Sequence, residues 1–229
     1  MQDNDWSEES NDKHLYSKEQ RNNIVVKTAL IGDPFVGKTS LMVKYVEGKF
    51  DEDYIQTLGV NFMEKNIYVK NLEITFSIWD VGGQKDFVTM LPLALSDTVA
   101  IVFMFDLTRK ITLQNVKEWY RQARTYNRSA LPFLVGTKFD GFVTLPKEEQ
   151  ITIVEQSRKF ARAMKAPLIF SSASHSINVQ KLFKVILAKL FDLRVSVEEN
   201  HNIGEPLLEL YNPLTSNGTT VASSSSSTG

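Results

Sequence analysis

A short glycine-rich segment is the first group of residues whose types and spacing could do chemistry. It reads Gly32-Asp33-Pro34-Phe35-Val36-Gly37-Lys38-Thr39, which fits the pattern G-x-x-x-x-G-K-[ST]. Glycines at both ends allow backbone N–H groups to wrap around a phosphate. Lys38 can reach the β and γ phosphates, and the Thr39 hydroxyl can bind Mg²⁺. The segment predicts nucleotide binding, but by itself it leaves ATP and GTP, and kinase and hydrolase, open.

A second candidate segment, Trp79-Asp80-Val81-Gly82-Gly83-Gln84, follows a strand-like run. An aspartate at a strand end is the expected partner of Mg²⁺ in phosphoryl transfer. Gly83 could offer its N–H to a γ-phosphate, and Gln84 is the right type to orient an attacking water. Taken alone, Asp-x-x-Gly also fits an ordinary turn.

A third segment, Gly136-Thr137-Lys138-Phe139-Asp140, favours guanine over adenine. The carboxylate of Asp140 could accept hydrogen bonds from both N1–H and N2–H₂ of guanine, whereas adenine presents no such donor pair. The next apolar run ends in Ser172-Ala173-Ser174. These loops together point to a guanine nucleotide.

The elements that must position these loops alternate between short β-rich runs and longer helical patterns. We expect strands at residues 24–31, 60–69, 72–79, 98–105, 131–135 and 168–170. We expect helices from Lys38 and at residues 113–126, 147–164 and 179–191. This alternation predicts an α/β fold of the P-loop NTPase type, with helices on both faces of the sheet. The six-stranded sheet should be mostly parallel, with one antiparallel hairpin strand and its ligand at the carboxyl ends of the strands.

Charge divides the 229 residues into a domain and two tails. Residues 24–193 carry a net charge of +5, because 22 basic residues outnumber 17 acidic ones, while residues 1–23 and 194–229 each carry −3. We predict a domain at 24–193, a disordered N-terminal tail, and a C-terminal tail that is Ser-rich and disordered at its end. The whole-chain net charge of −1 gives no reason to propose a nucleic-acid partner.

The chain contains no cysteine. Disulfides, Cys-ligated zinc, thiol catalysis and lipid attachment through cysteine are therefore excluded for this sequence. Met1-Gln2 also lacks the glycine that myristoylation needs. We expect no lipid anchor, so that placement in the cell depends on protein contacts.

The order and spacing of these motifs over residues 24–193 resemble the small GTPases of the Ras superfamily. The resemblance implies that Thr57, in the first switch, binds Mg²⁺ and the γ-phosphate, and that Phe50 packs against the base. It implies catalytic roles for Gln84, Lys38 and Thr57, and Mg²⁺ binding by Thr39, Thr57 and Asp80, the last through water. The residues expected to bind GTP or GDP are Gly32, Asp33, Pro34, Phe35, Val36, Gly37, Lys38, Thr39, Ser40, Phe50, Thr57, Gly83, Thr137, Lys138, Asp140, Ser172, Ala173 and Ser174.

Three positions depart from the common pattern of that superfamily. Thr137 stands where asparagine is usual, as in Rho-type members that still bind GTP. Pro34 replaces a frequent glycine next to the γ-phosphate, and Gly82 replaces the usual alanine, as in Arf-type members. Bulk at position 34 can hinder the approach of a GTPase-activating protein, but proline is compact and we expect hydrolysis to survive.

Within the superfamily, the segments 56–65, 78–84 and 136–140 look like those of the septum-promoting GTPases. That resemblance implies a GTP-hydrolysing switch whose GTP form recruits an effector protein kinase to start septation and cytokinesis signalling. It implies a cytoplasmic protein held at the spindle pole body or centrosome by a scaffold. Residues 50–59 contain no arginine, so a GTPase-activating protein should supply an arginine finger, and an exchange factor is possible.

Three other functions were weighed against the septation switch. A Rab-like vesicle-trafficking GTPase is the main alternative. A metabolic P-loop kinase would need a lid with arginines and a second substrate pocket. A pseudo-GTPase scaffold would have lost Lys38, Thr39, Thr57 or Gln84, and all four are present.

Overall fold

The computed structural model describes residues 23–51, 57–69, 72–193 and 197–211. The N-terminal tail, the Ser-rich end and most of the first switch, on which we made predictions, lie outside these residues. The strands are β1 Asn23–Gly32, β2 Val60–Val69, β3 Leu72–Val81, β4 Ala100–Asp106, β5 Leu131–Thr137, β6 Leu168–Phe170 and β7 Leu208–Glu209. The helices are α1 Lys38–Glu47, α2 Leu91–Leu95, α3 Lys110–Tyr126, α4 Phe139–Phe142, α5 Lys147–Met164 and α6 Val179–Leu190, with the 3₁₀ helix η1 at Lys85–Met90.

The strands form one sheet in the order β2-β3-β1-β4-β5-β6-β7. Strands β3, β1, β4, β5 and β6 run parallel to one another, and β2 is antiparallel to β3, which confirms the expected hairpin strand. Because the central strands run in one direction, the loops that follow Gly32, Val81, Asp106, Thr137 and Phe170 leave the sheet at the same edge. The predicted nucleotide loops are among them.

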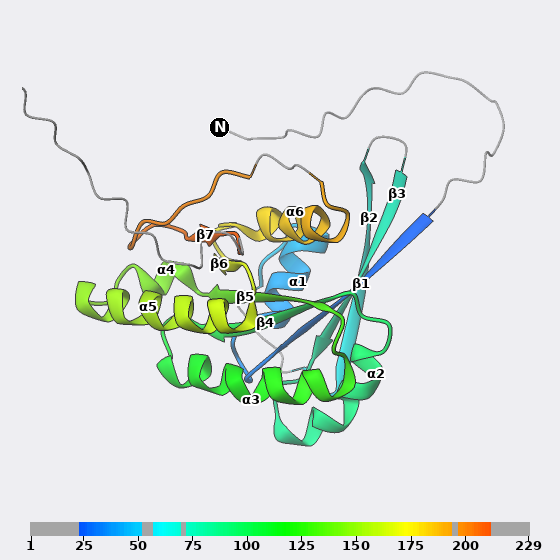
Figure 1. Ribbon diagram of the computed structural model, residues 1–229, viewed down its shortest axis with the longest axis horizontal. Helices are drawn as coiled ribbons and strands as arrows, with labels where there is room; N and C mark the ends of the chain where they lie inside the picture. Colours follow the sequence, from blue (N-terminus) through cyan, green and yellow to red (C-terminus); the bar gives the residue numbers. More distant parts are fainter. Residues whose placement is uncertain (1–22, 52–56, 70–71, 194–196, 212–229) are drawn as a thin grey trace, which may run out of the picture.

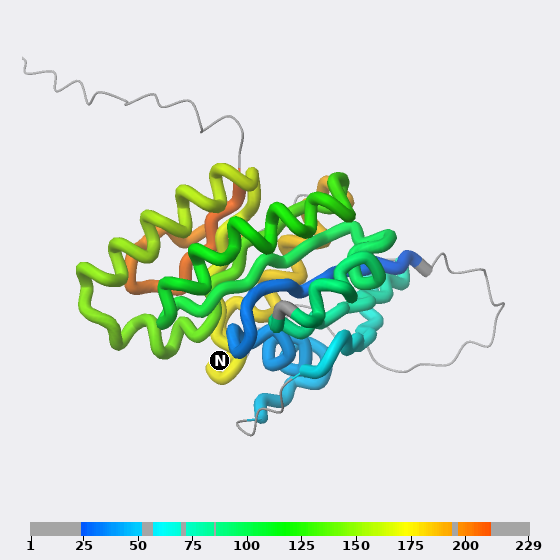
Figure 2. The backbone as a smooth tube through the Cα atoms, turned by 90° about the horizontal axis from the view of Figure 1, so that it is seen from below, coloured from blue at the N-terminus to red at the C-terminus, as the bar shows by residue number. Residues whose placement is uncertain are grey.

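Helices cover both faces of the sheet, as expected for this strand-helix alternation (Figure 1). Strand β4 is buried along its whole length, and its side chains alternate between two cores. Ile101, Phe103 and Phe105 pack with α2, α3 and α5, whereas Val102 and Met104 pack with α1 and α6. Figure 2 shows α3 and α5 side by side on their face of the sheet. The site-bearing edge therefore rests on a sheet that is packed from both sides.

The sheet has seven strands, not the six that we expected. The extra strand, β7, pairs antiparallel with β6 and lies in the stretch assigned to the C-terminal tail. The sequence feature that could have indicated this strand is a pair of apolar residues, Leu207 and Leu208, which are 0% and 1% exposed. A two-residue strand gives too short a pattern for alternation to reveal it.

The remaining differences are short helices. Sequence periodicity did not predict η1, α2 or α4, which have four to six residues each. Such helices have at most two turns, which is too short for a helical period to show in their sequence. No helix within the described residues is long and apolar enough to cross a membrane.

Candidate nucleotide-binding site

The glycine-rich segment forms the turn between β1 and α1. Gly32 lies against β4 so closely that a Cβ atom there would be 2.2 Å from the carbonyl oxygen of Met104. Gly37 has φ +90° and is the N-cap of α1, a conformation that glycine adopts without strain. Lys38 folds back along the loop, where its Nζ donates to the carbonyl oxygens of Gly32 at 3.0 Å and Asp33 at 2.8 Å. The loop thus places a lysine ammonium at the N-terminus of a helix, as phosphate binding requires.

Burial lowers the pKa of Lys38 to about 8, against the opposing effect of the Asp80 and Asp33 carboxylates. The ammonium is 5% exposed and has carbonyl oxygens as its hydrogen-bond acceptors. A phosphate in the loop would supply the negative charge that favours its protonated form.

The side chain of Asp33 is turned toward α3. Its carboxylate accepts hydrogen bonds from Asn115 Nδ2 and Trp119 Nε1, both at 2.7 Å. On the same side of the loop, Arg109 Nη2 donates to the carbonyl oxygen of Pro34 at 2.9 Å. Asp33 and Pro34 therefore anchor the outside of the loop to α3 and its N-cap residue, and Pro34 has no N–H to offer a phosphate.

Three oxygen-bearing side chains meet beside the loop. Thr39 Oγ1 lies 2.7 Å from Thr57 Oγ1, and both hydroxyls donate to Asp80 Oδ2, at 2.5 and 3.0 Å. Asp80 is fully buried, and no donor among the described residues reaches its Oδ1. Burial raises the pKa of Asp80, against the effects of Lys38 and of the two hydroxyls.

This oxygen cluster fits Mg²⁺. A buried carboxylate with an unsatisfied oxygen gains a partner when a divalent cation or its bound water approaches. Mg²⁺ prefers oxygen ligands and usually keeps several waters, which suits two hydroxyls and one carboxylate. The structure thus brings together the three residues expected to hold the ion.

The second switch segment touches the phosphate loop. A Cβ atom on Gly83 would be 2.4 Å from the backbone of Asp33 and Pro34, so only glycine fits there. Gly82 donates its N–H to the carbonyl oxygen of Gly59 at 2.8 Å, which ties this segment to the described end of the first switch. Gln84, half-buried, follows as the N-cap of η1. Gln84 therefore begins a helix one residue from the loop contact, where it could orient a water.

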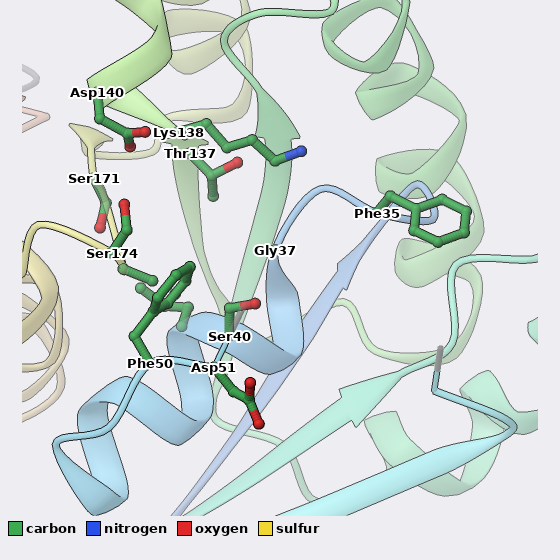
Figure 3. Close-up of a pocket in the computed structure, with 12 residues that line it drawn as sticks. Phe35, Gly37, Ser40, Phe50, Asp51, Thr137, Lys138, Asp140, Ser171 and Ser174 are labelled. Carbon is green, nitrogen blue, oxygen red and sulfur yellow. The ribbon is translucent and has the colours of Figure 1, made fainter. Parts of the chain in front are cut away.

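A cavity of about 260 Å³ lies between the phosphate loop and the last two site loops. Figure 3 shows Asp140, Ser171 and Ser174 gathered at one end of it, with the Phe50 ring and Ser40 nearby and the Phe35 ring turned away. The predicted residues that line it are Phe35, Gly37, Ser40, Phe50, Thr137, Lys138, Asp140, Ala173 and Ser174. The sequence did not single out Leu41, Asp51 or Ser171, which also line it.

Thr137 stands where asparagine is usual, and its hydroxyl lies within hydrogen-bonding distance of two carbonyl oxygens. Its Oγ1 reaches the carbonyl oxygen of Val36 at 2.5 Å and that of Phe105 at 3.0 Å. A single hydroxyl therefore ties the base-side loop to the phosphate loop and to β4. This contact gives a physical reason why threonine is compatible with the site.

Asp140 is held in place from the neighbouring loop. Ser172 is buried, and its Oγ lies 2.6 Å from Asp140 Oδ1. The hydroxyl fixes one carboxylate oxygen, and the side chain lines the cavity. Asp140 is thus placed to accept from the edge of a guanine base.

Asp106, which the sequence analysis did not single out, connects separate parts of the site. Its carboxylate pairs with Lys138 Nζ at 2.8 Å and with Arg109 Nε at 3.0 Å. The sequence feature that could have identified it is its position at the end of a fully apolar strand, in Asp106-Leu107-Thr108-Arg109. Because Arg109 also holds Pro34, Asp106 connects the phosphate loop to the guanine-selecting segment.

Comparison with known proteins agrees with this geometry. The model of the Ras family matches residues 27–192. The chain belongs to the Ras family. Septum-promoting GTP-binding protein 1 of Schizosaccharomyces pombe is 60% identical over 190 residues, which are 83% of this chain and 96% of that protein. Ras-related protein SEC4 of Saccharomyces cerevisiae is 31% identical over 181 residues, 79% of this chain and 80% of that protein, and SEC4 of Candida albicans is 30% identical over 185 residues.

Family membership confirms the predicted fold, activity and cofactors. This Ras-family chain is a GTPase that converts GTP to GDP and phosphate and uses Mg²⁺. Bound Mg²⁺ supplies positive charge to the β and γ phosphates. Lys38 and the loop N–H groups would add to that charge, and Gln84 is of the right type to orient the water.

Arg109 contacts the phosphate loop, and its guanidinium is engaged by the Asp106 carboxylate and the Pro34 carbonyl oxygen. An arginine that stabilises transition-state charge accelerates such hydrolysis by about 10³–10⁵-fold. Because of these two partners, Arg109 is not free to supply that charge in this structure.

Proposed function

We propose that this Ras-family GTPase is a switch in septation, whose GTP form recruits an effector protein kinase. The observation that carries the proposal is the 60% identity to a septum-promoting GTP-binding protein over 96% of that relative. The two SEC4 proteins, which represent the Rab-like alternative, are 30–31% identical. The septation role is therefore favoured over vesicle trafficking.

The switch itself follows from the contacts between the site's loops. Thr57 and Gly83 belong to separate segments, and both lie against the phosphate loop or its Mg²⁺ cluster. A γ-phosphate and Mg²⁺ would hold both segments, and loss of the phosphate would release them. An effector that reads both segments together would distinguish GTP from GDP.

Regulators complete the proposed cycle. A GTPase-activating protein would insert an arginine beside the γ-phosphate, and an exchange factor would open the site for nucleotide release. We also propose a scaffold that holds the protein at the spindle pole, with protein contacts as the means of attachment. The position of the fluorescently tagged protein in dividing cells tests this part: spindle poles support it, and vesicles contradict it.

Complementation in two yeasts tests septation against trafficking. In fission yeast cells in which the septum-promoting relative is repressed, the chain should restore septum formation. In budding yeast cells in which SEC4 is repressed, it should not restore secretion. Restored secretion without restored septum formation would contradict the septation role and support the trafficking role.

Kinase recruitment is tested with a pair of variants in the same binding assay. Thr39→Asn removes a hydroxyl from the Mg²⁺ cluster and should trap an inactive form, whereas Gln84→Leu should stay loaded with GTP. Immobilised Gln84→Leu should retain a protein kinase from extracts of dividing cells, and Thr39→Asn should not. Equal retention by both variants would contradict the switch.

A further inference from the structure

The described segment after α6, residues 197–211, lies against the strand that leads into the base-side loop (Figure 1). We call residues 197–211 the C-terminal strap and residues 171–178 the base loop. We propose that the strap is a positioning element of the nucleotide site: it fixes both ends of the base loop and thereby slows nucleotide release.

The strap holds the entrance of the base loop through strand pairing. In the β6–β7 ladder, Ile169 is opposite Leu208, and the N–H of Phe170 donates to the carbonyl oxygen of Leu207 at 2.9 Å. Phe170 is the last residue of β6, so this bond lies immediately before Ser171. The strap therefore stabilises the strand at the point where the base loop begins.

The strap holds the exit of the loop through one side chain. Asn178, the N-cap of α6, has φ +54°. Its Nδ2 donates to the carbonyl oxygen of Phe170 at 2.9 Å and lies 3.4 Å from those of Pro206 and Leu207. A single amide thus joins the two ends of the base loop to each other and to the strap.

Between those ends lie the groups that face the base. Ser172 Oγ donates to Asp140 at 2.6 Å and lies 3.0 Å from Ser174 Oγ. Ala173 and Ser174 line the cavity together with Asp140. A shift of either end of the loop would move Ser172 relative to Asp140, because the loop is only eight residues long.

The strap is itself anchored, so it can act as a support. Leu207 belongs to the core under α5, and Leu208 belongs to the core under α6. Arg158 of α5 pairs with Glu209 at 2.5 Å and donates to the carbonyl oxygen of His201 at 2.7 Å. The strap is therefore fixed by packing on both faces of the sheet and by an ion pair to α5.

This inference rests on the proposed assignment of the cavity to the base. If the base lies there, the base loop must move for nucleotide to leave, and the strap opposes that movement. The Mg²⁺ cluster and Gln84 lie on other loops, so the strap should affect release of nucleotide without changing the hydrolysis step.

The test uses two substitutions in the full chain. Asn178→Gly keeps the left-handed backbone conformation available while it removes the amide. Glu209→Ala removes the partner of Arg158 from a partly exposed position and leaves the buried leucines in place. Glu118→Ala, which removes the partner of Arg121 on α3, is the matched control. Release of fluorescent GDP and single-turnover hydrolysis of GTP are measured for each variant, with thermal unfolding alongside.

We expect Asn178→Gly to release GDP about fivefold faster, the effect of losing hydrogen bonds of ordinary strength. Glu209→Ala should accelerate release by about twofold, as expected for a partly exposed ion pair. Both should hydrolyse bound GTP at the wild-type rate, and Glu118→Ala should match the wild type in both measurements. If Asn178→Gly does not fold, Glu209→Ala carries the test.

Wild-type release rates in both folded strap variants would overturn the proposal. Faster GDP release together with slower GTP hydrolysis would also overturn it, because that result indicates general destabilisation. Asp140→Asn separates this failure from failure of the base assignment. If Asp140→Asn alters preference between guanine and xanthine nucleotides while the strap variants release GDP normally, only the strap proposal fails.

Discussion

The hydroxyl oxygens of Thr39 and Thr57 lie 2.7 Å apart, although the two residues are 18 positions apart in the chain. Thr39 is the second residue of α1 and Thr57 precedes β2, and the carboxylate of Asp80 accepts a hydrogen bond from each. The phosphate loop and both switch segments therefore converge on one small group of oxygens. Each of the three side chains is held in position by the other two. Removal of one hydroxyl should therefore weaken Mg²⁺ binding.

Thr57→Val tests this dependence, because valine has nearly the shape of threonine and lacks its hydroxyl. We expect the Mg²⁺ concentration needed to retain a GTP analogue to rise by about 10–100-fold, the usual cost of a lost group at a metal site. The measurement is the rate of analogue release across a Mg²⁺ titration, with chelator as the metal-free limit. Thr152→Val is the control, since Thr152 bonds only the α5 backbone at Glu148 among the contacts described. An unchanged Mg²⁺ requirement in Thr57→Val would remove Thr57 from the metal site.

Gly83→Ala tests the close approach of the second switch to the phosphate loop. The added Cβ would lie 2.4 Å from the backbone of Pro34, so the two segments must separate. We expect GTP hydrolysis to fall by about tenfold or more, because overpacking of this kind costs about 1–3 kcal/mol. GDP binding should change little, and single-turnover hydrolysis beside GDP titration makes the comparison.

Gly48→Ala is the matched control for that variant. Gly48 has φ +73°, but nothing lies within 4 Å of a Cβ built there. Alanine should lower stability through backbone strain and leave hydrolysis at the wild-type rate. Equal loss of hydrolysis in both glycine variants would attribute the effect to stability and not to the switch contact.

Asp140→Asn tests which base the cavity accepts. An amide offers one acceptor and one donor in place of two acceptors, which mismatches guanine N2–H₂ and matches the C2 carbonyl of xanthine. We expect GTP affinity to fall by about 10²–10³-fold and XTP affinity to rise, since polar groups left unpaired discriminate strongly. Displacement of bound fluorescent GDP by GTP and by XTP, measured separately, gives the ratio of the two affinities. Retained preference for GTP would place the base elsewhere.

Sequence reasoning predicted the parts of the site that consist of motifs. The positions of Lys38, Thr39, Asp80 and Asp140 at one edge of the sheet follow from their spacing and from the common edge of parallel strands. It could not predict that Asp33 turns toward Asn115 and Trp119, because those contacts span more than 80 residues. Long-range partners leave no local pattern in the chain.

The fold, too, could be predicted where local sequence patterns exist and not where long-range contacts decide. Strands such as β4, with seven consecutive buried residues, are visible as apolar runs. Strand β7 is not, because two residues show no alternation and the burial of Leu208 depends on contact with β6 and with the core under α6. Likewise, Asp106 looks like an ordinary strand-end residue until Lys138 and Arg109 are seen around it.

The Asp106 carboxylate is the centre of a charged network near the site. It is fully buried and accepts from Thr108 N at 2.9 Å and Thr108 Oγ1 at 2.6 Å, in addition to its two cations. Burial raises the pKa of Asp106, but the hydrogen bonds from Lys138 and Thr108 outweigh that effect and hold it below its ordinary value.

Asp106→Asn should lower the free energy of unfolding by about 1–3 kcal/mol, because two cations lose a buried charged acceptor. A lowered folded-state pKa gives stability that is present above the unfolded pKa of about 3.9 and is lost as pH falls through the folded value. The difference between wild type and Asp106→Asn should therefore be constant from pH 7 to pH 5 and shrink below about pH 4. Urea unfolding with GDP in fixed excess measures it. Glu155→Gln, at an exposed position of α5, should show little difference at any of these pH values. A wild-type advantage that persists undiminished at pH 3 would mean that the advantage does not depend on the charge of Asp106.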